Sequence, residues 1–143
     1  MTSAPDAGIL KCGEVLVPAR TDVDQLVRGI SEHDQKRTKP ECGIAWSFQH
    51  QPGDDTPTLM FGVRCETGAL MWFDATSALV PAHGTNHDHV DYFLAGAHLM
   101  VMPPGAELPI AQAHEAQREF VRTGQRPTCV DWVPDPEFHE HYQ

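Results

Sequence analysis

The sequence predicts an α+β domain in which two helices pack on one face of a mostly antiparallel sheet of about six to seven strands. Two segments, near residues 22–30 and 109–123, space their apolar residues as amphipathic helices do. Between them lie short runs of strand-favouring residues separated by glycine and proline. The 143 residues suffice for one domain with its own hydrophobic core and are too few for two domains of ordinary size. The expected order is β-α-β-β-β-β-β-α-β over a single domain, residues 1–143.

The first strand is expected over residues 9–17, where apolar and polar residues alternate before Pro18 ends the run. Thr21 or Asp22 can cap the helix that follows. Its apolar positions obey the spacing i, i+3, i+4, i+7 and are Val23, Leu26, Val27 and Ile30. The segment that follows this helix is polar, contains a cluster of basic residues, and is predicted to be a solvated loop.

Five further strands are expected before the second helix. Residues 44–50, 59–65 and 69–73 form three of them, the last two joined by a hairpin at Glu66-Thr-Gly68. Residues 90–94 and 98–102 form another pair around Ala95-Gly96-Ala97. The Pro103-Pro-Gly105 sequence then interrupts the strand pattern.

The last third of the chain shows where a helix begins and ends. Pro109 suits a first helical position, and Gly124 suits the left-handed residue just past the end. The apolar stripe between them would dock on the sheet and consists of Ile110, Ala113, Ala116, Phe120 and Val121. Residues 128–133 then favour a final strand, and the polar tail 135–143 is expected to be loose.

This last third resembles the C-terminal signature of immunity protein family one of bacterial polymorphic-toxin systems. The resemblance lies in Glu107-Leu-Pro and in Ala116-x-x-x-Phe120-Val-x-Thr123-Gly-x-Arg126-Pro-Thr-x-Val130-x-Trp132. Upstream, Thr67-Gly-Ala-Leu-Met-Trp72 and the segment from Val23 to Ile30 lie where that family places its central hairpin and first helix. Residues 76–102 depart from the pattern, with a His-rich loop in place of a short turn. The resemblance implies a non-enzymatic inhibitor of a deaminase or nuclease toxin.

The charge balance favours a basic partner. Lys and Arg number 10 and Asp and Glu number 20, giving a net charge of −10. Such a chain repels nucleic acid and membrane surfaces. The N-terminus shows no secretory signal and no run reaches the length of a membrane span, so a cytoplasmic location is expected.

The cysteines are expected to be small core residues. Cys12, Cys42, Cys65 and Cys129 lie far apart in strand-like runs and form no Cys-x-x-Cys pair. In a reducing compartment this pattern favours packing over disulfide or zinc chemistry. No cofactor is expected.

A His-rich segment offers an alternative function. In His83-Gly-Thr-Asn-His87-Asp-His89-Val-Asp91, strand alternation would place His87, His89 and Asp91 on one side, a geometry usable by zinc or iron. A small metal-dependent protein is therefore one alternative, and a plain polar loop entering a strand is another. The histidines of the tail, His139 and His141, fit a frayed terminus.

Hydrolytic catalysis has little support in the sequence. Neither Ser47 nor Ser77 lies in a Gly-x-Ser-x-Gly elbow, and no cysteine has the local signature of a thiol enzyme. There is no phosphate loop, dinucleotide fingerprint or His-Glu-x-x-His motif. The sequence thus predicts a protein that is not an enzyme.

Acidic and aromatic residues at strand ends and loops are the candidate toxin contacts, because binding residues are often displayed there. They are Asp54, Asp55, Trp72, Asp74, Asp88 and Asp91. Trp46 and Trp132 are expected in the core. The leading hypothesis is a monomer or weak dimer that neutralises a basic toxin domain by stoichiometric occlusion. An orphan regulatory module of the same fold remains a further alternative.

Overall fold

The structure, a computed structural model, describes residues 8–9, 14–16, 43–51, 56–94 and 98–135. Its centre is an antiparallel sheet of β3 (Gly43–Gln49), β4 (Thr58–Arg64) and β5 (Thr67–Phe73). Trp46 lies opposite Phe61 on β4, and Phe61 lies opposite Leu70 on β5. These large side chains share one face, so the register gives that face a continuous apolar surface.

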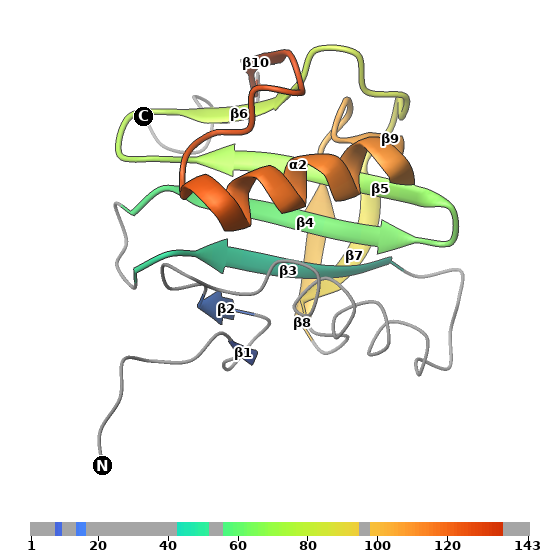
Figure 1. Ribbon diagram of the computed structural model, residues 1–143. Coiled ribbons are helices and arrows are strands. Elements are labelled where there is room, and N and C mark those ends of the chain that lie inside the picture. Colours follow the sequence, from blue (N-terminus) through green and yellow to red (C-terminus); the bar gives the residue numbers. More distant parts are fainter. Residues whose placement is uncertain (1–7, 10–13, 17–42, 52–55, 95–97, 136–143) are drawn as a thin grey trace.

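Each outer edge of this three-stranded centre pairs with two other strands. The first half of β3 pairs in parallel with β7 (Val90–Leu94), and its second half pairs in parallel with β2 (Glu14–Leu16). A short β1 (Gly8–Ile9) pairs with β2. Because one strand edge serves two neighbours that diverge, the sheet curls (Figure 1).

The opposite edge, on β5, divides in the same way. β9 (Glu107–Pro109) pairs with its beginning and β6 (Ala78–Pro81) with its end. β10 (Trp132–Pro134) then pairs with β6. The main path through the described sheet is β1-β2-β3-β4-β5-β6-β10. The sheet is mixed, because β3 pairs in parallel with β2 and β7 while the other described pairings are antiparallel.

Helix α2 (Ile110–Thr123) covers one face of the sheet (Figure 1). Gly68 allows the close approach of helix and sheet, since a Cβ there would lie 2.3 Å from the Cβ of Ala113. The helix ends at Gly124 with φ 68°, whose N–H bonds the Phe120 carbonyl at 2.8 Å. His50 Nε2 lies 2.9 Å from the same oxygen, so β3 and the helix end are joined.

The core between α2 and the sheet is built from large aromatic and aliphatic side chains. Trp72 and Phe120 meet edge to face with ring centroids 5.8 Å apart. The buried members of this core are Ile44, Trp46, Phe48, Leu59, Phe61, Leu70, Trp72, Leu108, Ala113, Ala116, Phe120 and Val121.

A second, smaller core lies on the other face, under the hairpin of β7 and β8 (His98–Met102). Tyr92 is fully buried there and its ring packs against two glycines. A Cβ on Gly43 would come within 2.3 Å of that ring, and one on Gly62 within 2.6 Å. Glycine at both positions therefore lets the hairpin pack directly on the sheet backbone.

Several sequence predictions need correction. The predicted first strand, residues 9–17, is described only at β1 and β2, which pair with each other as separate strands. β6 and β9 were not predicted. The described strand pairings are mostly antiparallel, as expected, but β3 pairs in parallel with β2 and with β7, which makes the sheet mixed. Pro109 ends β9 with ψ 140° and precedes the helix instead of beginning it. The last strand begins at Trp132, later than predicted.

Other predictions are confirmed or fall outside the described residues. Trp46 is fully buried, and Trp132 packs half-buried against the same core. The predicted first helix, residues 22–30, lies outside the described residues, as does most of the tail. Asp135, at the start of that tail, is buried and its N–H bonds the Ala78 carbonyl. No helix among the residues described has the length and apolar character needed to span a bilayer.

The cysteine prediction is wrong for the two cysteines that the structure describes. Cys65 and Cys129 are exposed, whereas Cys12 and Cys42 lie outside the described residues. Cys65 occupies the two-residue loop between β4 and β5 with φ 57°. Desolvation and the nearby Glu119 carboxylate raise the pKa of the Cys129 thiol to about 11, so it stays protonated at neutral pH.

Glu119 fastens the segment after α2 to the helix. Its Oε2 accepts hydrogen bonds from the Thr128 N–H (2.7 Å) and hydroxyl (2.8 Å), and its Oε1 accepts one from the Cys129 N–H (3.2 Å). Partial burial opposes ionisation, but these hydrogen bonds outweigh it and lower the pKa of Glu119 below its ordinary 4.5. The carboxylate thus positions the chain that leads into β10.

Replacing Glu119 with Gln should remove a pH-dependent part of the stability. A carboxyl whose pKa is lower in the folded state stabilises fully above its unfolded pKa and ceases to do so as the pH falls through its folded pKa. We expect a loss of about 1 kcal/mol in the free energy of unfolding at pH 7 that disappears towards pH 3, measured by urea denaturation. Glu115→Gln, at an exposed position of the same helix, is the control; an equal loss at both pH values would contradict the assignment.

Candidate partner-binding surface

The His-rich loop, residues 82–89, is held in place by Asn86. The Asn86 side-chain oxygen accepts hydrogen bonds from the N–H groups of Gly105 (3.1 Å) and Glu107 (2.8 Å). Its Nδ2 donates to the carbonyls of Asp88 and Pro103, both at 2.9 Å. One amide therefore joins the loop to the turn before β9, and the loop enters β7 with Asp88 and Asp91 exposed.

A second close contact supports the same junction. A Cβ on Gly84 would lie 1.8 Å from the Gly105 carbonyl oxygen, so the loop and the turn approach at backbone distance. The Thr85 N–H bonds the Glu107 carbonyl at 2.7 Å. The loop is thus an ordered polar structure, fixed by main-chain and amide hydrogen bonds.

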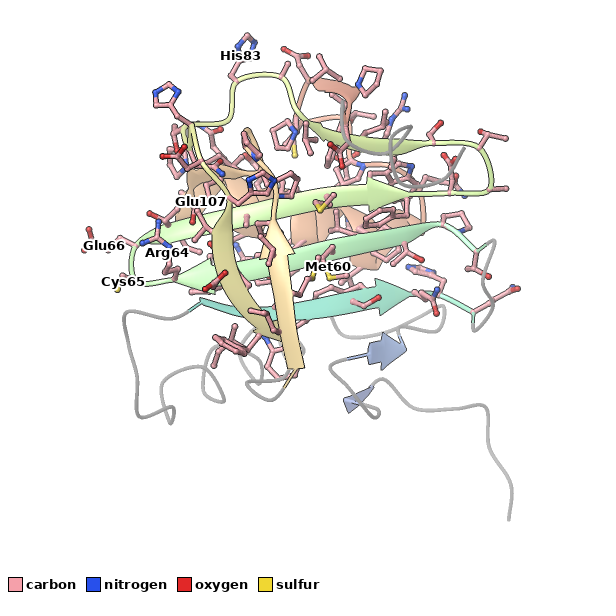
Figure 2. The ribbon with its side chains drawn as sticks, turned by 180° about the vertical axis from the view of Figure 1, so that it is seen from behind. Met60, Arg64, Cys65, Glu66, His83 and Glu107 are labelled. Carbon is pink, nitrogen blue, oxygen red and sulfur yellow. The ribbon has the colours of Figure 1, made fainter. Side chains whose placement is uncertain are left out.

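Below this junction lies a buried carboxylate with three donors. Glu107 is 3% exposed; Arg64 Nε donates to its Oε2 at 3.0 Å and Arg64 Nη2 to its Oε1 at 2.9 Å. The Tyr92 hydroxyl donates to Oε2 at 2.7 Å. Figure 2 shows Arg64 and Glu107 on the side of the sheet that β7 and β8 cross. The network joins β4, β7 and β9 beneath the hairpin.

The charges of this network balance internally. The hydrogen bond to Glu107 raises the pKa of Arg64 above its ordinary value, against the opposing effect of burial. Burial and the hydrogen bond to the same carboxylate also raise the pKa of Tyr92 well above 10.0. The tyrosine therefore stays neutral, and the arginine and glutamate form a bidentate pair. This arrangement is structural support for the surface above it.

Asp88 and Asp91 are the predicted contact residues that the structure exposes close to each other in the chain. The Asp74 carboxylate is instead engaged by its neighbours in the chain. It accepts hydrogen bonds from the Trp72 indole (3.0 Å) and from the Thr76 N–H (2.9 Å) and hydroxyl (3.2 Å). Burial opposes ionisation of Asp74, but these bonds prevail and lower its pKa.

The other predicted contact residues do not contribute to a described surface. Trp72 is 3% exposed and packs in the core under α2, so its ring is not available to a partner in this conformation. Its indole N–H is used by Asp74. Asp54 and Asp55 lie outside the described residues.

The geometry gives no support to the metal-binding alternative. His83, His87 and His89 are exposed, and His83 Nε2 lies 3.7 Å from an Asp131 oxygen, with both side chains more than four-fifths exposed. Within the described part of the chain, no three His, Cys, Asp or Glu side chains are grouped closely enough to hold a metal ion. The predicted ligand set of these histidines with Asp91 is therefore not assembled here.

Sequence reasoning missed the apolar part of this surface. Leu99 and Val101 on β8 are 59% and 42% exposed. They alternate along the strand and lie opposite Phe93 and Asp91 of β7, so all four side chains share the outer face of the hairpin. The run His98–Met102 is almost wholly apolar, and such a run does not show which of its faces meets solvent.

The Glu107 network should be worth measurable stability. Glu107→Gln should lower the free energy of unfolding by about 2–3 kcal/mol, because the Arg64 guanidinium loses its charged partner, and Tyr92→Phe by about 1 kcal/mol. Chemical denaturation measures both, and Glu66→Gln, at the exposed β4–β5 loop, should change stability by less than about 0.5 kcal/mol. If Glu107→Gln left the free energy of unfolding unchanged, the network would not stabilise the fold in this way.

Comparison with known proteins identifies the family. A search of curated proteins found no match for this chain. The family described as Immunity protein Imm1 matches residues 12–134, which include every described strand from β2 to β10 and the helix α2. The match extends over most of the chain and agrees with the resemblance in its last third. The protein belongs to the Imm1 family of immunity proteins.

Proposed function

We propose that this protein neutralises a cognate toxin that acts on nucleic acid, a deaminase or nuclease, by occluding it in a one-to-one complex in the cytoplasm. Membership of the Imm1 family is the observation that carries an immunity role. An immunity protein of this kind binds its toxin and performs no turnover. The net charge of −10 supports a basic partner.

The reason for this choice of toxin is electrostatic. An enzyme that acts on DNA or RNA needs an electropositive cleft for the phosphates. An acidic inhibitor is steered to that cleft and excludes the substrate from it. The proposed mechanism is therefore competition for the phosphate-binding site.

The described cations are unevenly distributed over the fold. Arg64 is bound to Glu107, and the other described cations, Arg118, Arg122 and Arg126, lie on α2 or directly after it. Asp91 lies on β7 and Asp88 in the loop that enters it, and the β7–β8 hairpin crosses the face of the sheet opposite α2 (Figure 1). That side is the better match for a basic toxin.

Coexpression should show neutralisation directly. The probe is the C-terminal domain of a toxin gene to be identified beside the gene for this protein, assayed for cleavage and deamination of single- and double-stranded DNA and RNA. We expect growth to be restored, the two proteins to elute together, and toxin activity to reach zero at one molar equivalent. Loss of activity at far lower ratios would indicate enzymatic inactivation, and the absence of a complex would favour the orphan regulatory module.

Charge reversal should locate the steering surface. The double variant Asp88→Lys with Asp91→Lys should slow association at least about tenfold at low salt, measured by stopped flow, because it replaces attraction by repulsion. The difference should shrink as salt shortens the Debye length from about 30 Å to about 8 Å. The control is Glu66→Lys with Glu115→Lys, which changes net charge equally at exposed positions elsewhere. Equal slowing by both variants would exclude a special role for the hairpin side.

A further inference from the structure

Strand β8 offers a backbone edge. It pairs with β7 along its whole length, from Leu94 opposite His98 to Val90 opposite Met102. Among the described residues, no strand pairs with its other edge. Within the described part of the chain, the N–H and C=O groups on that side have no main-chain partner, and such groups can pair with an added strand.

This edge differs from the ends of the main path through the sheet. β1 has two residues, and β10 has three and ends at Pro134, so both are short. β8 has five residues without proline, lysine or arginine. Natural proteins usually protect such an edge, and an unprotected one marks a site of strand addition.

The side chains beside the edge have the composition of an interface. Leu99 and Val101 are the most exposed large hydrophobic residues in the described chain. Asp91 lies directly across from Val101 on the same face. An apolar pair flanked by a carboxylate, on a hairpin whose inner face is fixed by Tyr92 of β7 and Met102 of β8, presents a preformed docking surface.

We propose that the toxin docks by adding one of its strands to the free edge of β8. This proposal rests on the proposed function and names the surface that performs it. The added strand places apolar side chains against Leu99 and Val101, and it carries lysine or arginine whose long side chains reach Asp91, about 10 Å away across β8. The partner is thus a polypeptide strand in which apolar and basic residues alternate.

Charge separates this occupant from a second copy of the same chain. Pairing two β8 edges would bring into contact two proteins of net charge −10, each with Asp91 one strand in from the edge. A basic strand removes that repulsion and replaces it with attraction. The observations therefore favour the toxin over self-association.

Affinity measurements test the side-chain part of the proposal. With the full-length protein and a catalytically inactive form of the adjacent toxin domain, Leu99→Ser with Val101→Ser should weaken binding by about 100-fold, as expected for two central apolar contacts. Val133→Ser on β10 is the matched control, since Val133 is 40% exposed on another strand, and should change binding less than about threefold. Thermal unfolding of each variant verifies that it is folded.

Hydrogen exchange tests the backbone part without any mutation. In the free protein, the β8 amides that point away from β7 should exchange quickly. In the toxin complex those amides should be protected at least about tenfold, which side-chain contact alone would not produce.

The outcomes separate the two proposals. If wild-type protein binds the toxin while β8 stays unprotected and the Leu99/Val101 variant binds normally, the docking surface is wrong and the proposed function stands. If the wild-type protein forms no complex, both are wrong. If sedimentation shows a dimer that the variant abolishes while toxin binding is unchanged, the edge serves a second copy and the proposal is overturned.

Discussion

The contact of the Tyr92 ring with Gly43 and Gly62 is the constraint on which the two-sided fold depends. Any side chain at either glycine would enter the ring, so only glycine lets the β7–β8 hairpin lie against the sheet backbone. The same tyrosine fixes the hairpin's position through its hydrogen bond to Glu107. A single residue thus combines close packing with a polar anchor, and the curl of the sheet follows, because β3 must pair with β7 and β2 on one edge.

The two faces of the sheet perform different physical tasks. On the helix side, large rings such as Phe120 and Trp72 fill the main core. On the hairpin side, small residues such as Ala45 and Ala69 admit the second layer closely. The hairpin's inner face is consequently fixed while its outer face, with Leu99 and Val101, remains exposed to solvent. The covered face of β7 and β8 thus contributes to packing, and the recognition proposed above uses the exposed face.

Local signals in the sequence were sufficient for the elements that local chemistry determines. Gly124 placed the end of α2 correctly, and the hairpin of residues 90–94 and 98–102 has the predicted bounds. Pro109, which suits a helix start, concealed the three-residue β9, whose pairing with β5 is a tertiary effect. The parallel pairing of β3 with β7 left no local trace either. Asp88 and Asp91 were selected by charge and loop position, whereas Leu99 required knowledge of which face of β8 is covered.

The hydrogen-bond networks of Asn86 and Glu107 affect the proposed binding, because they determine how much conformational freedom and how much charge the surface has in the free protein. Four hydrogen bonds from the Asn86 side chain already order the loop that carries Asp88, so little conformational entropy remains to be lost there. Glu107 is neutralised within the fold by Arg64, so its charge does not compete with the exposed aspartates for a basic partner. In the proposed complex, the exposed carboxylates of Asp88 and Asp91 steer a basic partner to the hairpin, and main-chain pairing at β8 follows. Such a mechanism requires geometry and charge and uses no reactive group.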